Sequence, residues 1–592
     1  MKYMTNLEYL RKIMKEKGYD YYIIPSSDSH QSEYVPDYYK GRQYVSGFTG
    51  SAGTLLVSLD EAFLWTDGRY FIQAESEIKP FGIKLMKMRT PGFPSIEEWI
   101  NENIKSGEVL GFDGEVISKK EYEVYEYLAK KNNFNINMNK DLLCDIWSER
   151  PELPKDNIFI LDEKFAGKSA KQKIEEVRKI MKKNEAENYI ISSLDDIAWL
   201  LNLRGNDILY NPVFLSYVLI TQSGAKLCIN RDKITNAVDK YLQSQGIIIE
   251  DYADIYEEVS KISNSVMIDS AKVNAKIYNF LKKDVKIIEK TNVTTSLKAV
   301  KNDIEIENIK KSHIRDGVAM VKFTKWLKEN IGKIPMSEIS ISDKLEGLRS
   351  EGENFKGLSF NTIAGYKEHA AMMHYSADKK SDYKLSPEGM LLVDSGAQYL
   401  DGTTDITRTF ILGEITEEEK RDFTLVLKGH IALASAIFLK GSTGESLDVL
   451  ARKPLWDYGI DYKCGTGHGV GFYLNVHEGP HSIRPKGNYV ELEPGMIVTN
   501  EPGVYKEGKF GIRTENIMLV EKAFEKEDMG EFLKFKTISY APIDLDGIDA
   551  KLLSEDEKAW INNYHKEVYY KLNSYLNEDE KEFLKKATME IK

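Results

Sequence analysis

Two strand-like runs, each bordered by a carboxylate, make up the stretch Met390-Leu-Leu-Val-Asp-Ser-Gly-Ala-Gln-Tyr-Leu-Asp-Gly-Thr-Thr-Asp-Ile-Thr-Arg-Thr-Phe410. An apolar run ends at Asp394, and an alternating run typical of a strand follows Asp405. Between them, Asp401-Gly402 is a strong signal for a tight hairpin turn. The stretch therefore predicts a β-hairpin that brings the carboxylates of Asp394 and Asp405 near each other. Because the midpoint of the two acids misses the Asp-Gly pair by about two residues, we also expect a bulge or a longer loop.

A second hairpin is predicted in the stretch Met496-Ile-Val-Thr-Asn-Glu-Pro-Gly-Val-Tyr-Lys-Glu-Gly-Lys-Phe-Gly-Ile-Arg-Thr-Glu515. Glu501 lies seven residues before Gly508, and Glu515 lies seven residues after it. A turn at Gly508 sets these two carboxylates opposite each other, with Cβ atoms roughly 5 Å apart. The two hairpins then present two pairs of acidic groups.

Four converging carboxylates repel one another and are costly to bury unless a cation joins them. Oxygen-rich ligation with one imidazole suits Mn²⁺, Fe²⁺, Co²⁺ or Zn²⁺, and carboxylates shared between ions suit a two-metal site. His468 lies in the Gly-rich stretch Cys464-Gly-Thr-Gly-His-Gly-Val-Gly471, whose glycines let the backbone pass close to a ligand. The alternative interpretation is two ordinary surface hairpins with solvated acids.

Histidines gather in the same part of the chain, because six of the nine lie between residues 369 and 481. These are His369, His374, His430, His468, His477 and His481. The segment His477-Glu-Gly-Pro-His481 matches the zinc-protease pattern His-Glu-x-x-His, which needs both histidines on one face of a helix. We reject that interpretation because a proline in a helix interior costs roughly 3 kcal/mol. The Gly-rich stretch also departs from the phosphate-binding pattern Gly-x-Gly-x-x-Gly.

An internal repeat predicts two related α/β domains at the start of the chain. Arg11-Lys-Ile-Met-Lys recurs as Arg178-Lys-Ile-Met-Lys, and Tyr-Ile-Ile follows eleven residues later, at Tyr22 and at Tyr189. Each copy has the pattern of an amphipathic helix that leads into an apolar strand. The shared spacing makes a chance identity a poor explanation.

Domain joins are marked by Pro151-Glu-Leu-Pro154 and by the charged stretch Lys298-Ala-Val-Lys-Asn-Asp303. We predict an α/β (α+β) protein with domains over residues 1–155, 156–302 and 303–592. The capping box Ser554-Glu-Asp-Glu557 then predicts a C-terminal helix that packs on the domain or forms a dimer. Its residues at helical spacing are Trp560, Tyr564, Val568, Leu572 and Tyr575.

The composition is that of an ordinary globular protein, with 592 residues, 42% hydrophobic and 29% charged. This excludes a disordered chain, a collagen-like repeat and a coiled-coil rod. The formal net charge of −12 gives no basic excess, so we do not expect a nucleic-acid partner. The sequence contains neither a signal-peptide core nor an apolar run of about 18 residues, so we expect no membrane segment and a cytoplasmic location. Three distant cysteines, Cys144, Cys228 and Cys464, predict no disulfide framework.

The motifs resemble those of the pita-bread metallopeptidases, a group that includes methionine aminopeptidase, prolidase and the Xaa-Pro aminopeptidases. The resemblance to the long cytosolic Xaa-Pro aminopeptidases covers nearly the whole chain. It is most specific in Thr66-Asp-Gly-Arg-Tyr-Phe71, Asp394-Ser-Gly-Ala-Gln-Tyr399, Asp401-Gly-Thr-Thr-Asp-Ile-Thr-Arg-Thr409, Gly465-Thr-Gly-His-Gly-Val-Gly471, Asn475-Val-His-Glu-Gly-Pro480 and Phe510-Gly-Ile-Arg-Thr-Glu-Asn516. It implies two creatinase-like N-terminal domains followed by a pita-bread catalytic domain.

The resemblance also implies a set of metal ligands. Asp394 would hold one ion, Asp405 and Glu515 would bridge two ions, and His468 and Glu501 would complete the second. Mn²⁺ is the usual ion of the family, and Zn²⁺, Co²⁺ and Fe²⁺ are alternatives. A bridging water or hydroxide would attack the carbonyl before proline, so the expected substrates are peptides with proline at position two.

The resemblance assigns further roles around these ligands. Glu501 is the candidate for moving a proton to the leaving proline nitrogen. His374 and His477 would steady the carbonyl or the intermediate and line the proline pocket. Tyr505 is a candidate for the substrate pocket, and Arg69 is a candidate for substrate binding from the first domain, either of the same chain or of a partner subunit. A homodimer is the assembly implied by the family.

Two alternatives and one departure accompany this interpretation. Prolidase, limited to Xaa-Pro dipeptides, has one N-terminal domain where two are expected here. A non-catalytic binding module with a pita-bread fold is the alternative from another functional class, but such proteins lose metal ligands and all five positions are filled here. Cys464 stands where several relatives have a histidine in the substrate pocket, and we interpret it as a neutral filler.

Overall fold

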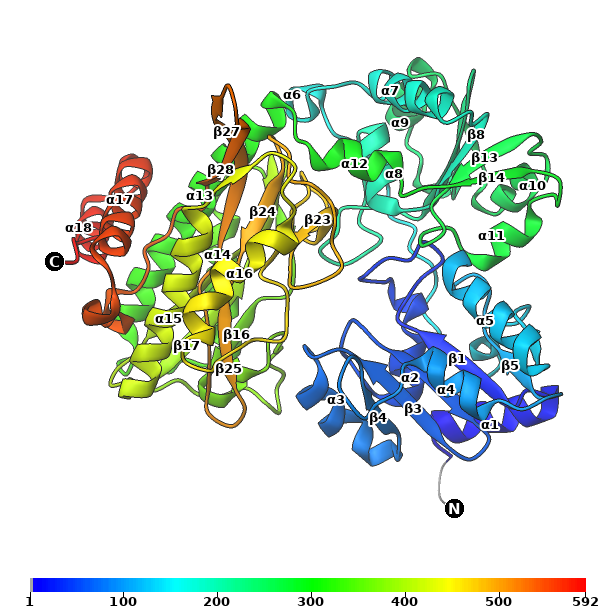
Figure 1. Ribbon diagram of the computed structural model, residues 1–592, viewed down its shortest axis with the longest axis horizontal. Helices are drawn as coiled ribbons and strands as arrows, with labels where there is room; N and C mark the ends of the chain where they lie inside the picture. Colours follow the sequence, from blue (N-terminus) through cyan, green and yellow to red (C-terminus); the bar gives the residue numbers. More distant parts are fainter. Residues whose placement is uncertain (1–3) are drawn as a thin grey trace. The chain divides into compact units, whose positions relative to one another are not determined.

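The computed structural model describes residues 4–592, and the chain divides into two compact units (Figure 1). The first unit runs up to Asp162 and resumes over Lys168–Thr295, and the second contains Glu163–Gly167 and Ser296–Lys592. Both units mix helices and sheets, so the predicted fold class is confirmed. The first unit contains both copies of the sequence repeat, and the finer domain boundaries at 155/156 and 302/303 remain predictions.

Two six-stranded sheets with the same topology form the core of the first unit, in the orders β4-β3-β2-β1-β5-β6 and β12-β11-β10-β8-β13-β14. The strand after the repeated helix pairs antiparallel with one neighbour and parallel with the other in both sheets. The first sheet contains β1 (Tyr21–Pro25), β2 (Thr54–Ser58), β3 (Ala62–Thr66), β4 (Lys84–Lys87), β5 (Val109–Gly111) and β6 (Asn135–Asn137). The second contains β8 (Asn188–Ile191), β10 (Ser216–Thr221), β11 (Ala225–Ile229), β12 (Ile247–Glu250), β13 (Ser265–Ile268) and β14 (Lys286–Glu289).

The repeated sequence forms the same helix-to-strand unit in both sheets, as predicted. Helix α1 leads into β1, and helix α7 leads into β8. Arg11 Nε donates to the carbonyl oxygen of Ser58 at 3.1 Å, and Arg178 Nε donates to that of Thr221 at 3.0 Å. Each repeated arginine therefore ties its helix to the end of the adjacent antiparallel strand. The helices of this unit are α1 (Asn6–Lys17), α2 (Gly41–Ser46), α3 (Phe71–Ile78), α4 (Ile96–Asn103), α5 (Lys119–Asn132), α7 (Ala170–Lys183), α8 (Leu194–Leu201), α9 (Asn236–Ser244), α10 (Ile255–Ser260) and α11 (Ala275–Phe280).

The second unit contains two helix-on-sheet layers, and the first of them is built on α13 (Asp303–Asn330) and α14 (Glu338–Ser350). These helices pack on the antiparallel sheet β16-β17-β20. The strands are β16 (Ile363–Tyr366), β17 (Met390–Ser395) and β20 (Ile406–Ile411). The shared core is formed by Met320, Phe323, Leu327, Ile341, Leu345, Leu391, Val393, Ile406 and Phe410.

The first predicted hairpin is confirmed, but its expected bulge was wrong. In β17 and β20, Ser395 lies opposite Ile406. Farther along, Gln398 of β18 (Ala397–Tyr399) lies opposite Thr403 of β19 (Gly402–Thr403). Both pairs belong to one register, so within the described residues 390–411 no inserted residue interrupts the pairing. The turn is formed by the two residues between Tyr399 and Gly402, one position earlier than the Asp-Gly pair suggested.

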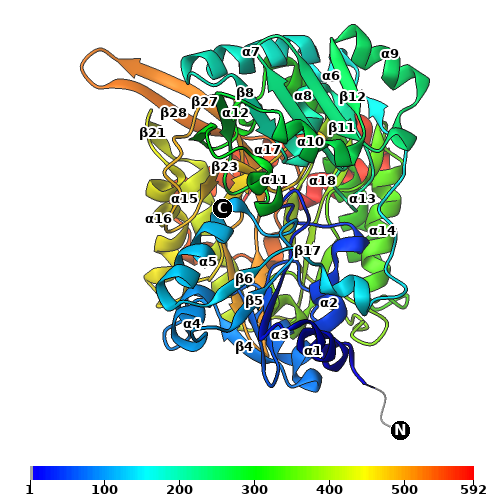
Figure 2. The same ribbon diagram turned by 90° about the vertical axis from the view of Figure 1, so that its right-hand side faces the viewer.

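The second layer packs α15 (Glu417–Ala434) and α16 (Gly444–Trp456) on the sheet β21-β28-β27-β24-β22-β23. Its strands are β21 (Ile437–Leu439), β22 (Gly467–Gly469), β23 (Glu478–Ile483), β24 (Ile497–Asn500), β27 (Asn516–Lys526) and β28 (Gly530–Thr537). The core between them is formed by Leu433, Phe438, Leu447, Ala451, Ile483, Met496, Val498, Met518, Val520, Leu533 and Phe535. The long hairpin of β27 and β28 is the orange ribbon in Figure 2.

The second predicted hairpin is confirmed in its register. β25 (Gly503–Lys506) pairs with β26 (Phe510–Arg513), and Gly508 lies in the turn with φ of 70°. Beyond the hairpin, Asn500 of β24 lies opposite Asn516 of β27 in the same register. Glu501 and Glu515 therefore occupy directly opposite positions, as the spacing predicted.

The C-terminal helix α17 (Glu555–Leu572) begins with the predicted capping box, in which Ser554 Oγ accepts from the N–H of Glu557. Tyr564, Val568 and Leu572 are buried in the core of the second unit, so the predicted packing role is confirmed for them. Tyr575 does not belong to the helix, because it lies in a short 3₁₀ turn after it, and its side chain is 62% exposed. The chain ends with α18 (Glu578–Ala587).

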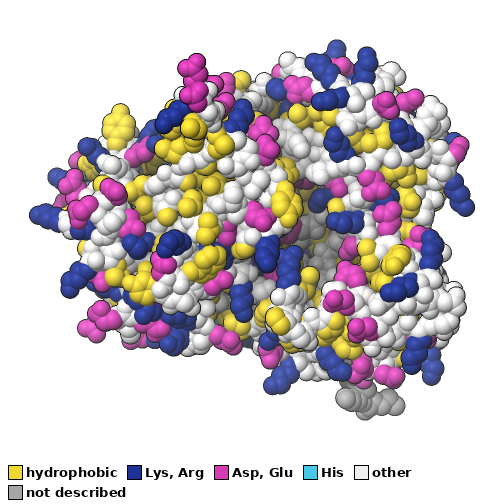
Figure 3. All heavy atoms as spheres, in the orientation of Figure 1, with side chains coloured by type: hydrophobic (Ala, Val, Ile, Leu, Met, Phe, Trp, Pro, Cys, Tyr) yellow, Lys and Arg dark blue, Asp and Glu magenta, His cyan; other side chains and the backbone are white. Residues whose placement is uncertain are grey.

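Among residues 4–592, none of the helices combines the length and the hydropathy needed to cross a membrane. On the face drawn in Figure 3, basic and acidic side chains are intermixed over the surface. Charge is therefore mixed rather than segregated on that face.

Candidate metal centre

Three predicted ligands come together at the junction of the two layers of the second unit. Ligand atoms of Asp405, His468 and Glu515 all lie within 4.8 Å of one another. His468 Nε2 lies 3.5 Å from Asp405 Oδ2 and 3.4 Å from Glu501 Oε1. One imidazole from β22 and three carboxylates from residues that border β20, β24 and β27 thus face a common point.

Backbone hydrogen bonds bring the two hairpins together at their acids. The N–H of Glu515 donates to the carbonyl oxygen of Thr407 at 3.1 Å, and the N–H of Glu501 donates to that of Thr466 at 2.8 Å. The backbone pairing of the second hairpin is interrupted at Glu501 and Glu515, because the N–H groups of these opposed residues donate to other segments and not to each other. One bond reaches β20, which follows Asp405, and the other reaches Thr466, which directly precedes the strand of His468. This geometry explains why acids from distant segments share one site.

The tautomer of His468 is fixed by its surroundings. His468 Nδ1 lies 2.8 Å from the carbonyl oxygen of Gly469, which can only accept, so Nδ1 has the proton. Nε2 then faces Asp405 and Glu501, and its lone pair is the one that a metal ion would use. A backbone carbonyl that holds one ring nitrogen while the other faces a ligand position is the usual arrangement of a metal-binding histidine.

The acids of this cluster are held in an unfavourable environment. Burial raises the pKa of Asp405 to about 6, and the neighbouring charge of Asp394 adds to the effect, while the hydrogen bond with His468 opposes it. Burial and the charges of Asp405, Asp394 and Glu501 raise the pKa of Glu515 well above its ordinary value. Burial lowers the pKa of His468, but its contacts with Asp405 and Glu501 outweigh that effect and raise it to about 9. A divalent cation would relieve this repulsion.

Asp394 is the fourth predicted carboxylate, and a positively charged side chain of the protein faces it. The Arg513 guanidinium forms an ion pair with Asp394 Oδ2, while Asp394 Oδ1 is buried with no hydrogen-bond partner among the described residues. A buried orphan oxygen is costly, and a metal ligand position accounts for it. The donor set, four carboxylates and one imidazole with Nε2 exposed to them, therefore fits hard or borderline divalent ions.

Arg513 is the functional residue that sequence reasoning missed. It is 3% exposed, and it donates to Tyr505 Oη at 2.6 Å, to Thr407 Oγ1 at 3.1 Å and to the carbonyl oxygen of Met373 at 3.4 Å. It lies two residues before Glu515 in the Phe-Gly-Ile-Arg-Thr-Glu block. This position beside a predicted metal ligand is the feature of the sequence that could have indicated its role. A buried arginine beside a metal-ligating acid fixes the orientation of that carboxylate.

Two of the predicted substrate residues lie beside this cluster. The His477 ring packs edge-on against His468 with centroids 4.4 Å apart. Tyr505 is half-buried in β25 and accepts from Arg513. His374 follows Met373, whose carbonyl oxygen accepts from Arg513, so its backbone also lies next to the site.

Arg69 lies in the first unit, in the loop between β3 and α3. Its Nε and Nη2 donate to the Asp67 carboxylate at 2.9 and 2.8 Å, and its Nη1 lies 3.7 Å from Glu33. The side chain is 26% exposed. Its predicted role in substrate binding remains a prediction.

The His-Glu-x-x-His segment is not helical, as expected from its proline. Residues after His477 form β23, and His481 is buried with Nε2 on the carbonyl oxygen of Ile497 at 2.8 Å. Burial lowers the pKa of His481 to about 3. Its environment is that of a neutral core histidine, and the rejection of the zinc-protease interpretation is confirmed.

Family models match four consecutive parts of the chain. The model described as Metallopeptidase family M24 matches residues 307–522, and the C-terminal region of that peptidase matches residues 531–591. Two models of the Creatinase/Prolidase N-terminal domain match residues 6–136 and 149–305. The second and third segments meet close to the join predicted near residue 303.

Similar proteins extend over the full length. The chain is 41% identical over 606 residues to a protein of Paracoccidioides brasiliensis (strain Pb03) named "Probable Xaa-Pro aminopeptidase P". The alignment covers 98% of each of the two chains. The crystal structure of X-prolyl aminopeptidase from Caenorhabditis elegans matches with a TM-score of 0.95 and 34% identity over 100% of both chains. That protein is described as a cytosolic enzyme with a di-nuclear active site. Xaa-Pro dipeptidase from Bacillus anthracis covers 64% of this chain at 23% identity and a TM-score of 0.50, which shows a shared fold alone.

Proposed function

Because the chain belongs to metallopeptidase family M24 and matches Xaa-Pro aminopeptidases over its full length, we propose that it removes the N-terminal residue from peptides whose second residue is proline. The observation that supports this most directly is the meeting of Asp405, His468 and Glu515, with Glu501 within reach of His468. Prolidase is the second candidate, but the B. anthracis dipeptidase aligns with only part of this chain.

Two divalent ions are proposed as the cofactor, with Mn²⁺ as the first choice. Asp394, Asp405, His468, Glu501 and Glu515 are the proposed ligands. The C. elegans enzyme, which is described as di-nuclear, supports the number of ions, and the oxygen-rich donor set supports their type. When bound, such ions supply Lewis acidity toward the scissile carbonyl and lower the pKa of a water molecule.

Residues of the chain then supply positioning and proton transfer. Glu501 is proposed to hold a proton on its carboxylate and deliver it to the leaving proline nitrogen. Glu501 Oε1 accepts a hydrogen bond from Thr499 Oγ1 at 3.1 Å, and this bond orients the Glu501 side chain within the cluster. His374 and His477 are proposed to donate hydrogen bonds to the carbonyl oxygen as charge develops on it.

The proline pocket is proposed to lie beside these histidines. Tyr505 offers an aromatic ring there, and its hydroxyl is held by Arg513. Arg69 is proposed as a substrate-binding residue from the family resemblance alone. A homodimer and a cytosolic location are proposed on the same basis, the latter supported by the description of the C. elegans enzyme.

Peptide cleavage tests the proposed function. With Mn²⁺ added, the protein should release the first residue of a Xaa-Pro-Yaa tripeptide at least about 100-fold faster than that of the matched Xaa-Ala-Yaa peptide, because the pocket is built for the proline ring. A chelator should abolish the release, and Mn²⁺ should restore it. Cleavage of the Xaa-Pro dipeptide but of no longer peptide would instead establish prolidase. Absence of both bound metal and cleavage would favour the binding module.

Cys464 stands where several relatives have a histidine, and this difference provides a test of the proposed substrate pocket. Its side chain is partly buried against the apolar cluster that includes Tyr462 and Tyr505, and its carbonyl oxygen accepts from Arg452 at 2.7 Å. These contacts support a filler role. We expect Cys464→His to keep kcat/KM within about threefold of the parent value on the proline tripeptide. A complete loss of activity with normal metal content would show that the thiol has a role in the reaction.

A further inference from the structure

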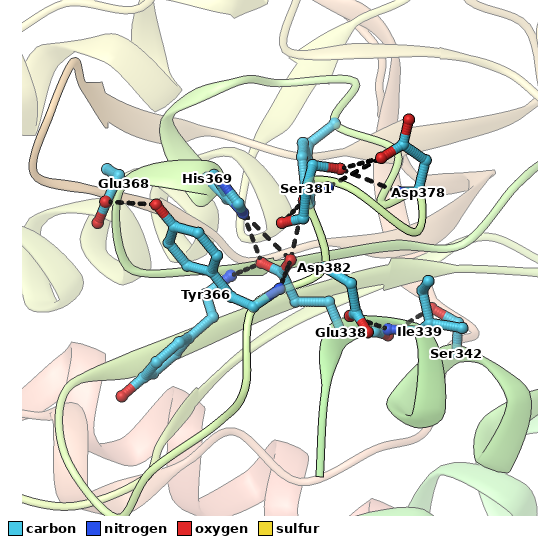
Figure 4. Close-up of polar contacts among 11 residues, drawn as sticks. Glu338, Ile339, Ser342, Tyr366, Glu368, His369, Asp378, Ser381 and Asp382 are labelled. Carbon is cyan, nitrogen blue, oxygen red and sulfur yellow. Dashed lines mark hydrogen bonds and ion pairs between the residues drawn. The ribbon is translucent and has the colours of Figure 1, made fainter.

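A buried carboxylate outside the metal cluster accepts four hydrogen bonds from one segment of the chain (Figure 4). The Glu338 side chain is fully buried at the start of α14, directly after the N-cap. It accepts from the backbone N–H groups of Tyr366 and Tyr383, each at 2.9 Å, and from the Tyr375 hydroxyl at 2.8 Å. His369 Nδ1 lies 3.0 Å from the same carboxylate. All four donors belong to residues 366–383.

These bonds close the segment 366–383 on itself. Tyr366 and Tyr383 stand at its two ends, so the Glu338 carboxylate joins backbone positions 17 residues apart. The His369 ring stacks on Tyr383, with 3.7 Å between centroids, and lies tilted against Tyr375, with 4.4 Å between centroids. Asp382 Oδ1 accepts from the N–H of Ile339 at 3.0 Å, which fastens the same segment to the first turn of α14. The anionic group also lies where the helix dipole favours negative charge.

The segment meets the metal cluster on its other side. The carbonyl oxygen of Met373 accepts from Arg513 Nη2 at 3.4 Å, and Arg513 pairs with Asp394. His374 is therefore placed between two fixed neighbours. Met373 is held by the arginine of the metal cluster, and Tyr375 is held by Glu338. A side chain positioned in this way loses little freedom when it meets a substrate.

We propose that Glu338 is a positioning residue of the reaction, which sets the place of His374 by closing the segment 366–383. The proposal rests on the role of His374 in the proposed function. Glu338 touches neither the metal ligands nor the substrate in this scheme, so it acts only through the segment. Glutamate suits this position because an ionised carboxylate accepts at both oxygens, whereas an amide has a single acceptor oxygen and would turn its NH₂ group toward one of the two backbone N–H groups.

The test replaces Glu338 by glutamine in the full-length, Mn²⁺-loaded enzyme and follows cleavage of the proline tripeptide. We expect kcat to fall by about 10-fold to 100-fold, because a displaced His374 ring is no longer correctly oriented toward the substrate. Metal content should stay at the parent value, since no proposed ligand is altered. Glu346→Gln is the matched control, because Glu346 is an exposed glutamate of the same helix, and it should leave kcat unchanged. Tyr375→Phe, which removes a single donor, should give a smaller loss of about threefold to tenfold.

A double-mutant cycle with His374→Ala separates positioning from general damage to the fold. If Glu338 acts through His374, Glu338→Gln should change kcat by less than about twofold in the His374→Ala background. Equal losses from Glu338→Gln in both backgrounds would overturn this inference and leave the proposed function intact. Full activity of His374→Ala alone would remove His374 from the proposed reaction and this inference with it. Full activity of both Glu338→Gln and Tyr375→Phe would also overturn the inference.

Discussion

Replacing Asp405 or His468 by alanine is expected to lower kcat on the proline tripeptide by about 10³-fold, the upper end of the loss that follows removal of one electrostatic element of a site. Each residue contributes a ligand atom to the group that lies within 4.8 Å. His468 Nε2 lies 3.5 Å from Asp405 Oδ2 and 3.4 Å from Glu501 Oε1, so its replacement removes an imidazole nitrogen that faces these acids. The fold should persist, because neither side chain belongs to a hydrophobic core of its layer.

Metal content is the second readout of these variants. Asp405→Ala and His468→Ala should each retain less Mn²⁺ than the parent after dialysis, while circular dichroism and the elution volume stay the same. Glu507→Gln, at the exposed tip of the second hairpin, removes a carboxylate on the same element and should retain both metal and activity. Undiminished turnover in Asp405→Ala or in His468→Ala would refute the ligand assignment.

Strand register explains why the acids could be predicted so well. A residue at a known distance from a hairpin turn has its partner at the same distance on the other side, so the seven-residue spacing about Gly508 was enough to pair Glu501 with Glu515. The first hairpin was predicted with the turn one residue too late, because the Asp-Gly signal was assigned to the wrong turn positions. The error shifts the predicted register by two residues, and because the side-chain period of a strand is two, each side chain keeps its face of the sheet.

Residues that matter through distant contacts could not be predicted in this way. Arg513 is 119 positions from Asp394, and neither residue indicates the other by spacing. Glu338 has no feature in the sequence that distinguishes it from other glutamates in the first turn of a helix. Its four donors become visible only when residues 366–383 fold back on α14. Local periodicity thus predicts elements and hairpin geometry, whereas contacts between elements need the structure.

Removal of the metal is expected to make the free energy of unfolding fall as the pH rises from about 4 to about 6. In the metal-free fold, burial and neighbouring charges raise the pKa of Asp405 from 3.8 to about 6. Between these values the folded state binds more protons than the unfolded state, so stability is present at low pH and is lost as the pH rises through 6. For Asp405 alone the loss is on the order of 3 kcal/mol. The raised pKa of Glu515 acts in the same direction.

His468 extends this dependence to higher pH. Its pKa of about 9 in the folded state lies above the ordinary 6.5, so its contribution is present below pH 6.5 and is lost as the pH rises through 9. A bound cation holds the acids ionised and the imidazole neutral, and the loaded protein should therefore lack both declines. Thermal unfolding with Mn²⁺ and with chelator, measured from pH 4.5 to 8, should show a difference in Tm that widens with pH. Asp405→Asn should flatten the curve of the metal-free protein, because the amide has no charge to desolvate. Parallel curves of Tm against pH with and without metal would show that the charge repulsion within the cluster is relieved by something other than a cation.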